Sequence, residues 1–256
     1  MQKVALVFLL FSSLWSNAQE RNQPLLLDRS VLSGVGLEKI DLKDEPEKDF
    51  HQKRLYSGED ISIYVVSTET WNNDFKNFWF DEFIYMYHGE ALIKPENGRS
   101  MLFHSGDYFF APKGFTGEWE IRAGNHLHYE LSVITTHRAD STRISAEDDH
   151  QLFNRSTLSG AHIDLNEVNP YHEILRKGVE LTVTLHAERP SSIQMSDQSK
   201  ERLVHLLSGQ ISIVDINEEE HTFYTGDFFV LPKNCQGEWK SNGHGMIKYL
   251  TVEKSK

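Results

Sequence analysis

The sequence predicts an all-β protein that consists of two similar β-barrels in tandem. Two observations support this prediction. The chain matches itself without gaps when it is shifted by 120 residues, and each copy contains short apolar runs separated by turn residues rather than long amphipathic helical patterns. The composition is that of a globular protein, and 256 residues are enough for two domains with their own cores.

The internal repeat is clearest in a glycine-rich segment near the end of each copy. The segment Gly106–Trp119 lies over Gly226–Trp239, and eight of the fourteen aligned positions are identical. The same shift pairs Gly58 with Gly178, Gly89 with Gly209 and Tyr129 with Tyr249. Such a fixed period indicates a tandem duplication.

Each copy has the rhythm of an all-β domain. In the first copy, runs rich in Ile, Val, Phe and Tyr predict strands at 60–66, 82–87, 91–94, 108–110 and 127–134. Glu96-Asn97-Gly98 is typical of a hairpin turn, and the Gly-Asp pairs at 106 and 226 are typical of turns before a strand. This spacing predicts a small sandwich or barrel in each copy.

The N-terminus has the three parts of a secretory signal peptide, namely a basic start, an apolar run and small residues around Ala18. The apolar run is too short for a membrane anchor. We therefore expect a signal peptide at 1–18, an N-terminal barrel at 19–135, a polar linker at 136–160 and a C-terminal barrel at 161–256. The mature protein is expected to be periplasmic or secreted, with no membrane attachment.

Charge and cysteine content exclude several classes of function. The net charge of −12 argues against binding to nucleic acid or to an anionic membrane surface. The single cysteine, Cys235, excludes an intrachain disulfide and a zinc site made of cysteines. No histidine base is indicated beside Cys235, so we interpret it as a structural residue. The remaining histidines, including His205 and His221, are interpreted as turn or surface residues.

Two spaced motifs in the first copy resemble a known family. Glu82 is followed by Gly89, and Gly106 is followed by Pro112 and Gly114, at the spacings of the two motifs of the cupin family. The Gly-Asp and Pro-Lys-x-x-x-Gly-Glu-Trp pattern is most similar to the cupin subfamily named for ureidoglycine aminohydrolase. The resemblance covers both copies and implies a bicupin, that is, two double-stranded β-helix (jelly-roll) barrels in one chain.

The metal site implied by this resemblance lacks most of its ligands. Metal-binding cupins use a His-x-His pair, the first-motif Glu and a second-motif His. The corresponding positions in the first copy hold Phe75 and Asn77, or Lys76 and Phe78, then Glu82 and Gly117. Those in the second copy hold Met195 and Asp197, or Ser196 and Gln198, then Arg202 and Gly237. We therefore expect no cofactor, and a divalent metal only in a rearranged site.

An apolar pocket around Glu82 is the alternative use of the first barrel. Phe78 and other aromatic residues surround Glu82, so this carboxyl group is expected to have a raised pKa and to serve as a general acid or base. A second interpretation is that Glu82 pairs with a basic residue. Trp119 and Trp239 follow the two glycines and either stack on a ligand or fill the core. Arg202 is expected to point into the second barrel and contact a ligand.

A different metal site is also conceivable from alternation along one strand. His126, His128 and Glu130 occupy alternate positions, so they share one face, and these side chains are ligands for zinc, iron or manganese. The 120-residue shift places Met246, Lys248 and Leu250 at the same positions in the second copy. If the face points outward, the three residues form only a polar surface.

Two classes of function follow from the sequence. The first is a binding protein that holds a small organic ligand in the N-terminal barrel without the usual metal. The second is a small-molecule hydrolase or isomerase, which would use either a rearranged metal site or Glu82 as an acid and base. A monomer and a homodimer both remain open.

Overall fold

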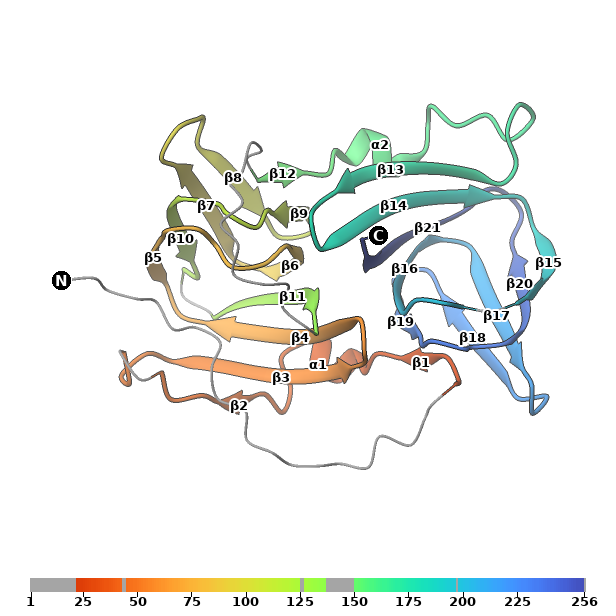
Figure 1. Ribbon diagram of the computed structural model, residues 1–256, viewed down its shortest axis with the longest axis horizontal. Helices are drawn as coiled ribbons and strands as arrows, with labels where there is room; N and C mark the ends of the chain where they lie inside the picture. The colour runs from red at the N-terminus through yellow and green to blue at the C-terminus, as the bar shows by residue number, and fades with distance from the viewer. Residues whose placement is uncertain (1–21, 43–44, 125–126, 137–149, 197, 256) are drawn as a thin grey trace.

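The computed structural model describes residues 22–42, 45–124, 127–136, 150–196 and 198–255. The predicted signal peptide and His126 lie outside these residues. Figure 1 shows two barrels side by side, each built from one large and one small antiparallel sheet. None of the helices in this part of the chain has the length and apolar character that a bilayer crossing requires.

The first barrel contains a seven-stranded and a four-stranded sheet. The large sheet has, in spatial order, β12 (Gln151–Leu152), β9 (Tyr108–Ala111), β6 (Glu82–His88), β11 (His128–Thr135), β4 (Ile61–Thr68), β3 (Phe50–Ser57) and β2 (Glu38–Lys39). The small sheet has β5 (Trp71–Phe75), β10 (Gly117–Arg122), β7 (Glu90–Pro95) and β8 (Met101–His104).

The second barrel repeats this design. Its six-stranded sheet has β1 (Leu25–Leu26), β19 (Phe228–Leu231), β16 (Arg202–Ser208), β21 (Ile247–Lys254), β14 (Leu181–Glu188) and β13 (Tyr171–Lys177). Its four-stranded sheet has β15 (Ser191–Met195), β20 (Gly237–Asn242), β17 (Gln210–Asp215) and β18 (Glu220–Tyr224). The two helices are short, α1 (Arg29–Leu32) and α2 (Arg155–Ser159).

The predicted all-β tandem fold is confirmed. Each of the five strands predicted in the first copy overlaps a strand of the structure, and β7 and β8 form a hairpin around Asn97 and Gly98. The strands β3, β5, β8 and β10 were not predicted. β3, β5 and β10 each contain several polar residues, and β8 is only four residues long, so none of the four stands out as a long apolar run.

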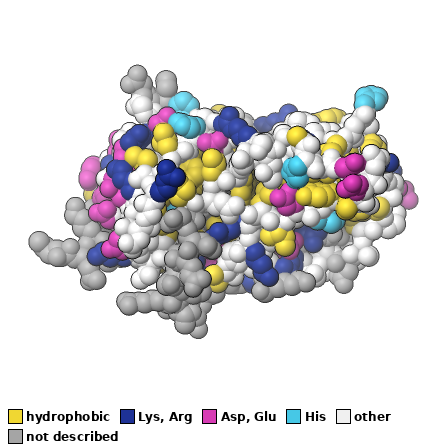
Figure 2. Space-filling view, turned by 90° about the horizontal axis from the view of Figure 1, so that it is seen from above, with side chains coloured by type: hydrophobic (Ala, Val, Ile, Leu, Met, Phe, Trp, Pro, Cys, Tyr) yellow, Lys and Arg dark blue, Asp and Glu magenta, His cyan; other side chains and the backbone are white. Residues whose placement is uncertain are grey.

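Buried apolar side chains form three clusters. One fills the first barrel around Phe109, and another fills the second barrel around Phe229. The third lies between the two large sheets and includes Ile63 and Val133 from the first barrel and Val183 and Val252 from the second. This shared core joins the barrels into one body, which Figure 2 shows from above with its basic side chains scattered among acidic and uncharged ones.

Two carboxylates fasten the barrels to each other in a reciprocal arrangement. Asp81 of the first barrel accepts hydrogen bonds from the backbone N–H groups of Glu180 and Leu181, at 2.6 and 3.2 Å. Glu201, the residue at the same position of the second copy, accepts from the backbone N–H groups of 59–61 at 2.8–3.1 Å. A Cβ atom on Gly58 would lie 2.0 Å from the Glu201 carboxylate, and one on Gly178 would lie 2.2 Å from Asp81. The paired glycines therefore make room for these contacts.

The lysine of each Pro-Lys pair also acts between the barrels. Lys113 Nζ lies 2.5 Å from the carboxylate of Glu180, and both side chains are buried. Lys233, at the same position of the second copy, lies 3.2 Å from Asp60 and 2.7 Å from Glu59. The repeated Pro-Lys motif thus holds the interface and does not line an interior site.

Each barrel receives an edge strand from outside its own repeat. Strand β1 pairs with β19 of the second barrel, and β12 pairs with β9 of the first. Both strands are followed by a short helix whose first residue, Arg29 or Arg155, pairs with Asp227 or Asp107 of the Gly-Asp turn. Residues 150–160 had been predicted to belong to a polar linker. In the structure this segment is packed against the first barrel, because Phe153 and Leu158 are buried in the shared core.

Candidate functional site

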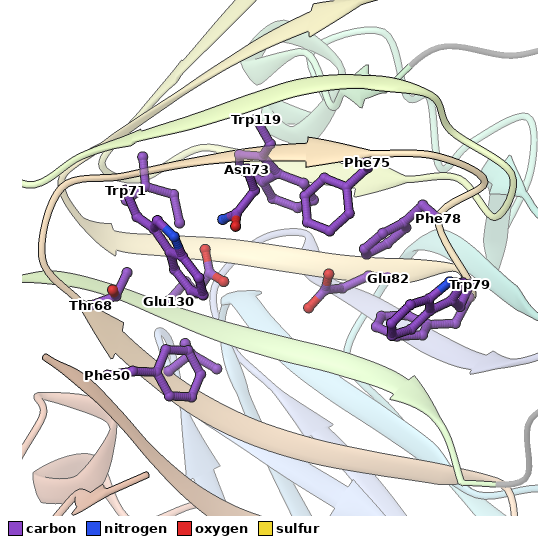
Figure 3. A pocket seen from close by; sticks show the side chains of 13 residues that line it. Phe50, Thr68, Trp71, Asn73, Phe75, Phe78, Trp79, Glu82, Trp119 and Glu130 are labelled. Atoms are coloured by element: carbon purple, nitrogen blue, oxygen red, sulfur yellow. The ribbon is translucent and has the colours of Figure 1, made fainter. Parts of the chain in front are cut away.

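A cavity lies inside the first barrel, between the large and the small sheet. It offers about 60 Å³ to the centres of water molecules, which is room for several waters or a small ligand. Most of its wall is aromatic and comes from β3, β5, β10 and the loop between β5 and β6. The aromatic lining residues are Phe50, Trp71, Phe75, Phe78, Trp79, Phe80 and Trp119 (Figure 3).

Two carboxyl groups reach into this aromatic cavity. Glu82 is the first residue of β6, and Glu130 lies on the neighbouring strand β11, opposite Met86. Only 4% of the surface of Glu82 and 7% of that of Glu130 is exposed to solvent. Figure 3 shows both carboxyl groups pointing into the cavity, with Glu82 next to Phe78 and Trp79 and Glu130 next to Trp71. The Lys and Arg side chains that would neutralise them are missing from the lining residues.

Hydrogen bonds and burial set the protonation state of Glu82. Ser132 Oγ donates to Glu82, and His128 Nε2 lies 2.7 Å from a carboxylate oxygen of Glu130. Burial, and after it the charge of Glu130, raises the pKa of Glu82 to about 8, although the Ser132 hydrogen bond opposes this rise. Glu82 therefore keeps its proton near pH 7, as expected for a carboxyl group that is buried in an apolar site.

Some polar groups of the cavity wall have no partner. Among the described residues, the indole nitrogen of Trp71 and the hydroxyl of Thr68 are buried without a hydrogen bond. The amide of Asn73 points into the cavity (Figure 3). Leaving a buried donor unpaired costs about 1–3 kcal/mol, so such groups are normally satisfied by water or by a ligand.

Trp119 contributes to the cavity wall and to the core at the same time. The centroid of its ring lies 5.7–5.8 Å from the ring centroids of Phe75 and Phe78. It lies 5.2 Å from the ring centroid of His150, in an edge-on arrangement. Burial lowers the pKa of His150 to about 3, so this ring is neutral and behaves as part of the core. The two interpretations of Trp119 from the sequence are therefore compatible in the first barrel.

The same positions in the second barrel are filled and paired. Trp239 Nε1 donates to Glu188 at 3.0 Å, and Glu188 occupies the position of Thr68. Arg202 replaces Glu82 and pairs with Glu253 at 2.7 Å, so its guanidinium already has a partner within the protein, and a ligand contact of Arg202 stays a prediction. Tyr249 stacks on His186 with ring centroids 4.7 Å apart. The second-barrel interior is thus closed by contacts within the protein.

The sequence alignment of the last strand was wrong by one residue. Strand β4 pairs Ile63 with Val133, whereas β14 pairs Val183 with Val252, so the shift is 119 residues for this strand. Glu130 therefore corresponds to Tyr249 and not to Leu250, and His128 corresponds to Ile247. The loop between the last two strands is one residue shorter in the second copy, and a gap-free comparison could not detect this difference.

The other histidine predictions have mixed outcomes. His128 and Glu130 do share a face, and both are buried inside the first barrel rather than on its surface. His205, interpreted above as a turn or surface residue, is buried and contacts the hydroxyl of Tyr108 at 2.9 Å. Cys235 is buried, and burial raises the pKa of its thiol to about 11, in agreement with a structural role.

The metal site implied by the cupin resemblance does not fit the first barrel. Phe75 and Phe78 place rings in the cavity where imidazoles would be needed. A side chain cannot be added at Gly117, because its Cβ would lie 2.4 Å from the carbonyl oxygen of Lys94. Gly237 is blocked in the same way by Val214 at 2.2 Å. The second-motif histidine is thus excluded by backbone packing in both barrels.

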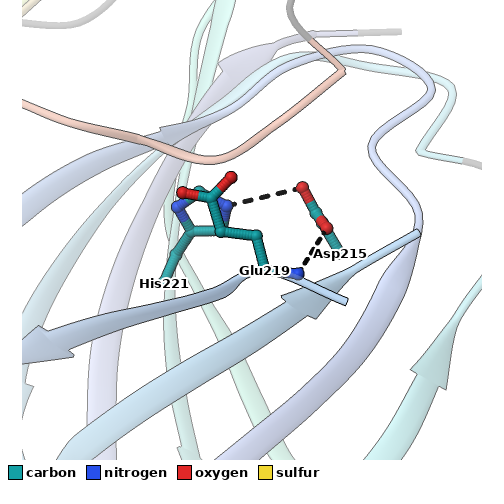
Figure 4. Close-up of side chains that lie close together, drawn as sticks. All are labelled: Asp215, Glu219 and His221. Atoms are coloured by element: carbon teal, nitrogen blue, oxygen red, sulfur yellow. Dashed lines mark hydrogen bonds and ion pairs between the residues drawn. The ribbon is translucent and has the colours of Figure 1, made fainter. Parts of the chain in front are cut away.

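In the described part of the chain, one group of three potential metal ligands has its ligand atoms within 4.8 Å of one another. It consists of Asp215, Glu219 and His221 at the β17–β18 hairpin (Figure 4). Asp215 accepts from the backbone N–H groups of Asn217 and Glu219, at 2.8 and 3.0 Å. These contacts show that the three residues belong to the turn of the hairpin. The turn is in the second barrel, far from the cavity of the first.

Sequence reasoning identified Phe78, Glu82 and Trp119 as site residues, and the structure brings these three together. It missed Thr68, Trp71 and Asn73, which complete the polar part of the cavity. The buried residues of β5 alternate with exposed ones, so the sequence Trp71-x-Asn73-x-Phe75 did carry a strand pattern.

Comparisons with known proteins agree with this architecture. The EutQ-like cupin domain family matches residues 70–129 and 176–249, one segment in each barrel. No curated protein matches the sequence significantly.

Similar solved structures share the fold at low sequence identity. A cupin 2 conserved barrel domain protein from Leptotrichia buccalis has a TM-score of 0.60 and 14% identity, over 91% of this chain and 96% of that one. Protein YlbA from E. coli has a TM-score of 0.56 and 15% identity, over 91% of both chains. Salicylate 1,2-dioxygenase from Pseudoaminobacter salicylatoxidans, in adducts with gentisate, has a TM-score of 0.61 and 12% identity, over 90% and 81%. Because the family match covers more than half of the sequence, the chain belongs to the family of EutQ-like cupin domains.

Proposed function

We propose that the first barrel binds a small organic molecule in the cavity between Glu82, Glu130 and the aromatic wall, and that it does so without the usual cupin metal. The observation that carries this proposal is the difference between the two barrels. Buried polar groups of Trp71 and Thr68 lack partners beside a cavity in the first barrel, whereas Trp239 and Glu188 satisfy each other in the second.

A panel of small alcohols, amides, acids and amines tests this proposal through tryptophan fluorescence and the shift of Tm. We expect at least one chemical class to bind the wild-type protein. Val66→Phe, which fills the cavity, should abolish that binding, and His186→Phe at the same position of the second barrel should preserve it. Circular dichroism checks that both variants fold. Binding that survives Val66→Phe, or no binding by any class, would contradict the proposal.

The metal-free part of the proposal has a separate test. Elemental analysis of the purified protein should find no stoichiometric manganese, iron or zinc. A stoichiometric metal that is lost from a His128→Ala, Glu130→Ala variant would instead support the alternative site at His128 and Glu130.

One observation favours an enzymatic alternative. Glu82 holds a proton near pH 7 beside a second carboxyl group, which is the arrangement of a general acid next to a base. Under this alternative the protein is a small-molecule hydrolase or isomerase similar to ureidoglycine aminohydrolase. Turnover of any bound member of the panel that is lost in Glu82→Gln, while binding remains, would establish it.

Export is proposed from the N-terminal sequence alone. The basic, apolar and small-residue parts of 1–18 support a cleaved signal peptide and a periplasmic or secreted protein. N-terminal sequencing of the protein recovered from the periplasm or medium should begin at Gln19. An intact Met1 in a cytosolic fraction would contradict this proposal.

A further inference from the structure

We infer that the ligand of the first barrel is an organic cation, an ammonium group that also carries a neutral oxygen acceptor. This inference rests on the proposed function, because it assigns a chemical class to the molecule in the same cavity.

The acidic groups of the cavity wall favour a positively charged ligand. Glu82 and Glu130 both point into the cavity, and the residues that line it include no Lys, Arg or His. His128 contacts Glu130 and is itself buried. Lys48 lies 6.0 Å from the Trp71 ring but is not part of the lining, and it faces Glu69 at 3.7 Å. Glu130 thus has one partner within the protein, and a carboxyl group can accept more than one contact, so a ligand cation would supply the opposite charge that the lining residues lack.

The aromatic wall favours the same charge. Phe75, Phe78 and Trp119 form a three-ring cluster, with centroids 5.1–5.8 Å apart. Trp71 stands on the other side, next to Glu130 (Figure 3). The faces of aromatic rings carry negative electrostatic potential and attract ammonium groups, most strongly when water is excluded. Rings and carboxyl groups therefore select one type of ligand.

The unpartnered groups indicate the second part of the ligand. The Trp71 indole can only donate a hydrogen bond, and its nitrogen is buried without an acceptor among the described residues. The Thr68 hydroxyl is in the same condition and lines the same cavity. An oxygen on the ligand would satisfy them. This oxygen is neutral, because a ligand carboxylate would be repelled by Glu130.

Cation binding should also displace a proton. Burial and the neighbouring Glu130 keep Glu82 protonated near pH 7, and Ser132 is the group that donates to it. A cation beside Glu82 favours the ionised form and lowers the pKa of this group. We therefore expect up to one proton to be released for each cation bound at pH 7, mainly from Glu82.

Three probes of nearly equal shape and different charge test the inference: choline, the neutral 3,3-dimethylbutan-1-ol and the anionic 3,3-dimethylbutanoate. Isothermal titration calorimetry should show choline binding at least about tenfold more tightly than the alcohol, the difference expected from a desolvated cation beside rings. The anion should not bind. Titrations in buffers of different ionisation enthalpy should show proton release, and Glu82→Gln should abolish that release.

Variants locate the effect and separate the two proposals. Glu130→Gln should weaken choline binding at least about tenfold, the scale of a lost charge-assisted contact, whereas Arg202→Gln in the second barrel should leave it unchanged. Equal or tighter binding of the alcohol or the anion would overturn the cation inference and leave the proposed pocket intact. If none of the three probes binds, the cation inference fails. The proposed function then fails only if no member of the wider panel binds in a manner sensitive to Val66→Phe.

Discussion

The two barrels share their framework almost residue by residue but differ in their interiors. Asp81 and Glu201 receive backbone hydrogen bonds from the opposite barrel in the same manner, and Lys113 and Lys233 contact carboxylates across the interface. Inside, the first barrel has two carboxyl groups and no Lys or Arg in its cavity lining, whereas the second has Arg202 paired with Glu253. Similarity between the copies therefore marks the framework, and difference marks the candidate site.

This comparison changes how the repeated motifs should be interpreted. The Gly-Asp and Pro-Lys residues are the most alike in the two copies, yet they hold the edge strands and the interface rather than a ligand. Because the barrels contact each other through these residues, a change at such a residue in one copy would affect both barrels. The interior of one barrel can then change without loss of the shared core.

The largest difference in stability between matched substitutions is expected at the two interface lysines, Lys113 and Lys233. Lys113→Met leaves the buried Glu180 without its ion-pair partner, so the free energy of unfolding should fall by about 3–5 kcal/mol. Lys233 is more exposed, with 28% of its side chain accessible against 6% for Lys113. Lys233→Met should therefore cost about 1 kcal/mol or less. Urea denaturation of both variants measures these losses, and equal losses would contradict the asymmetry.

The second prediction concerns pH and the buried carboxyl of Glu82. Its pKa in the folded protein is about 8, above the ordinary value of 4.5, so the folded protein binds the extra proton between these values. The contribution of Glu82 to the free energy of unfolding should therefore be highest below about pH 4.5. It should be lost as the pH rises to about 8.

Glu82→Gln removes this titration. The variant should gain stability relative to the wild type as the pH rises from 5 to 8, on the scale of about 1.4 kcal/mol for each unit of pKa shift. Arg202→Gln, the matched change in the second barrel, should show no such trend. Urea denaturation at several pH values measures both, and parallel pH profiles for wild type and Glu82→Gln would refute the prediction.

The third prediction compares the two tryptophans that close the barrels. Trp239→Phe leaves the buried Glu188 without its indole donor, whereas Trp119 has no hydrogen bond to lose among the described residues. The two changes remove similar volumes. Trp239→Phe should therefore be more destabilising than Trp119→Phe, by about 1–2 kcal/mol, the usual cost of an unpaired buried group. Equal thermal shifts would indicate that the Trp119 indole is also paired, for example through water.

Sequence reasoning reached the tandem all-β fold because the duplication is exact in spacing over the glycine-rich segment. It did not reach the exchange of edge strands. Asp28-Arg29-Ser30 and Asn154-Arg155-Ser156 begin the two short helices, but they are 126 residues apart. A fixed shift of 120 residues does not align them. The second barrel also has one residue fewer before its last strand, which concealed the correspondence of Glu130 with Tyr249.

The candidate site was predicted only in part for a physical reason. Glu82, Phe78 and Trp119 belong to recognisable motifs, and their side chains could be assigned to the barrel interior. The pairing of Glu82 with Glu130 depends on the register between β6 and β11, which a sequence alone does not give. The same holds for Arg202, whose partner Glu253 lies on the neighbouring strand.

The smallest effects are expected where the two barrels are equivalent and partly exposed. Arg29 and Arg155 pair with Asp227 and Asp107, but 65% and 68% of their side chains are accessible to solvent. The aspartates also keep hydrogen bonds from backbone N–H groups at 2.8 Å, so neither is left without a partner when its arginine is removed.

Arg29→Ala and Arg155→Ala should therefore each lower the free energy of unfolding by about 1 kcal/mol or less, and by equal amounts within about 0.5 kcal/mol. High salt should reduce both losses, because the pairs are exposed. Chemical denaturation at low and high ionic strength measures this. A loss several times larger for one arginine would mean that the exchanged strands support the two barrels unequally, so that the difference between the barrels would extend from the interior to the framework.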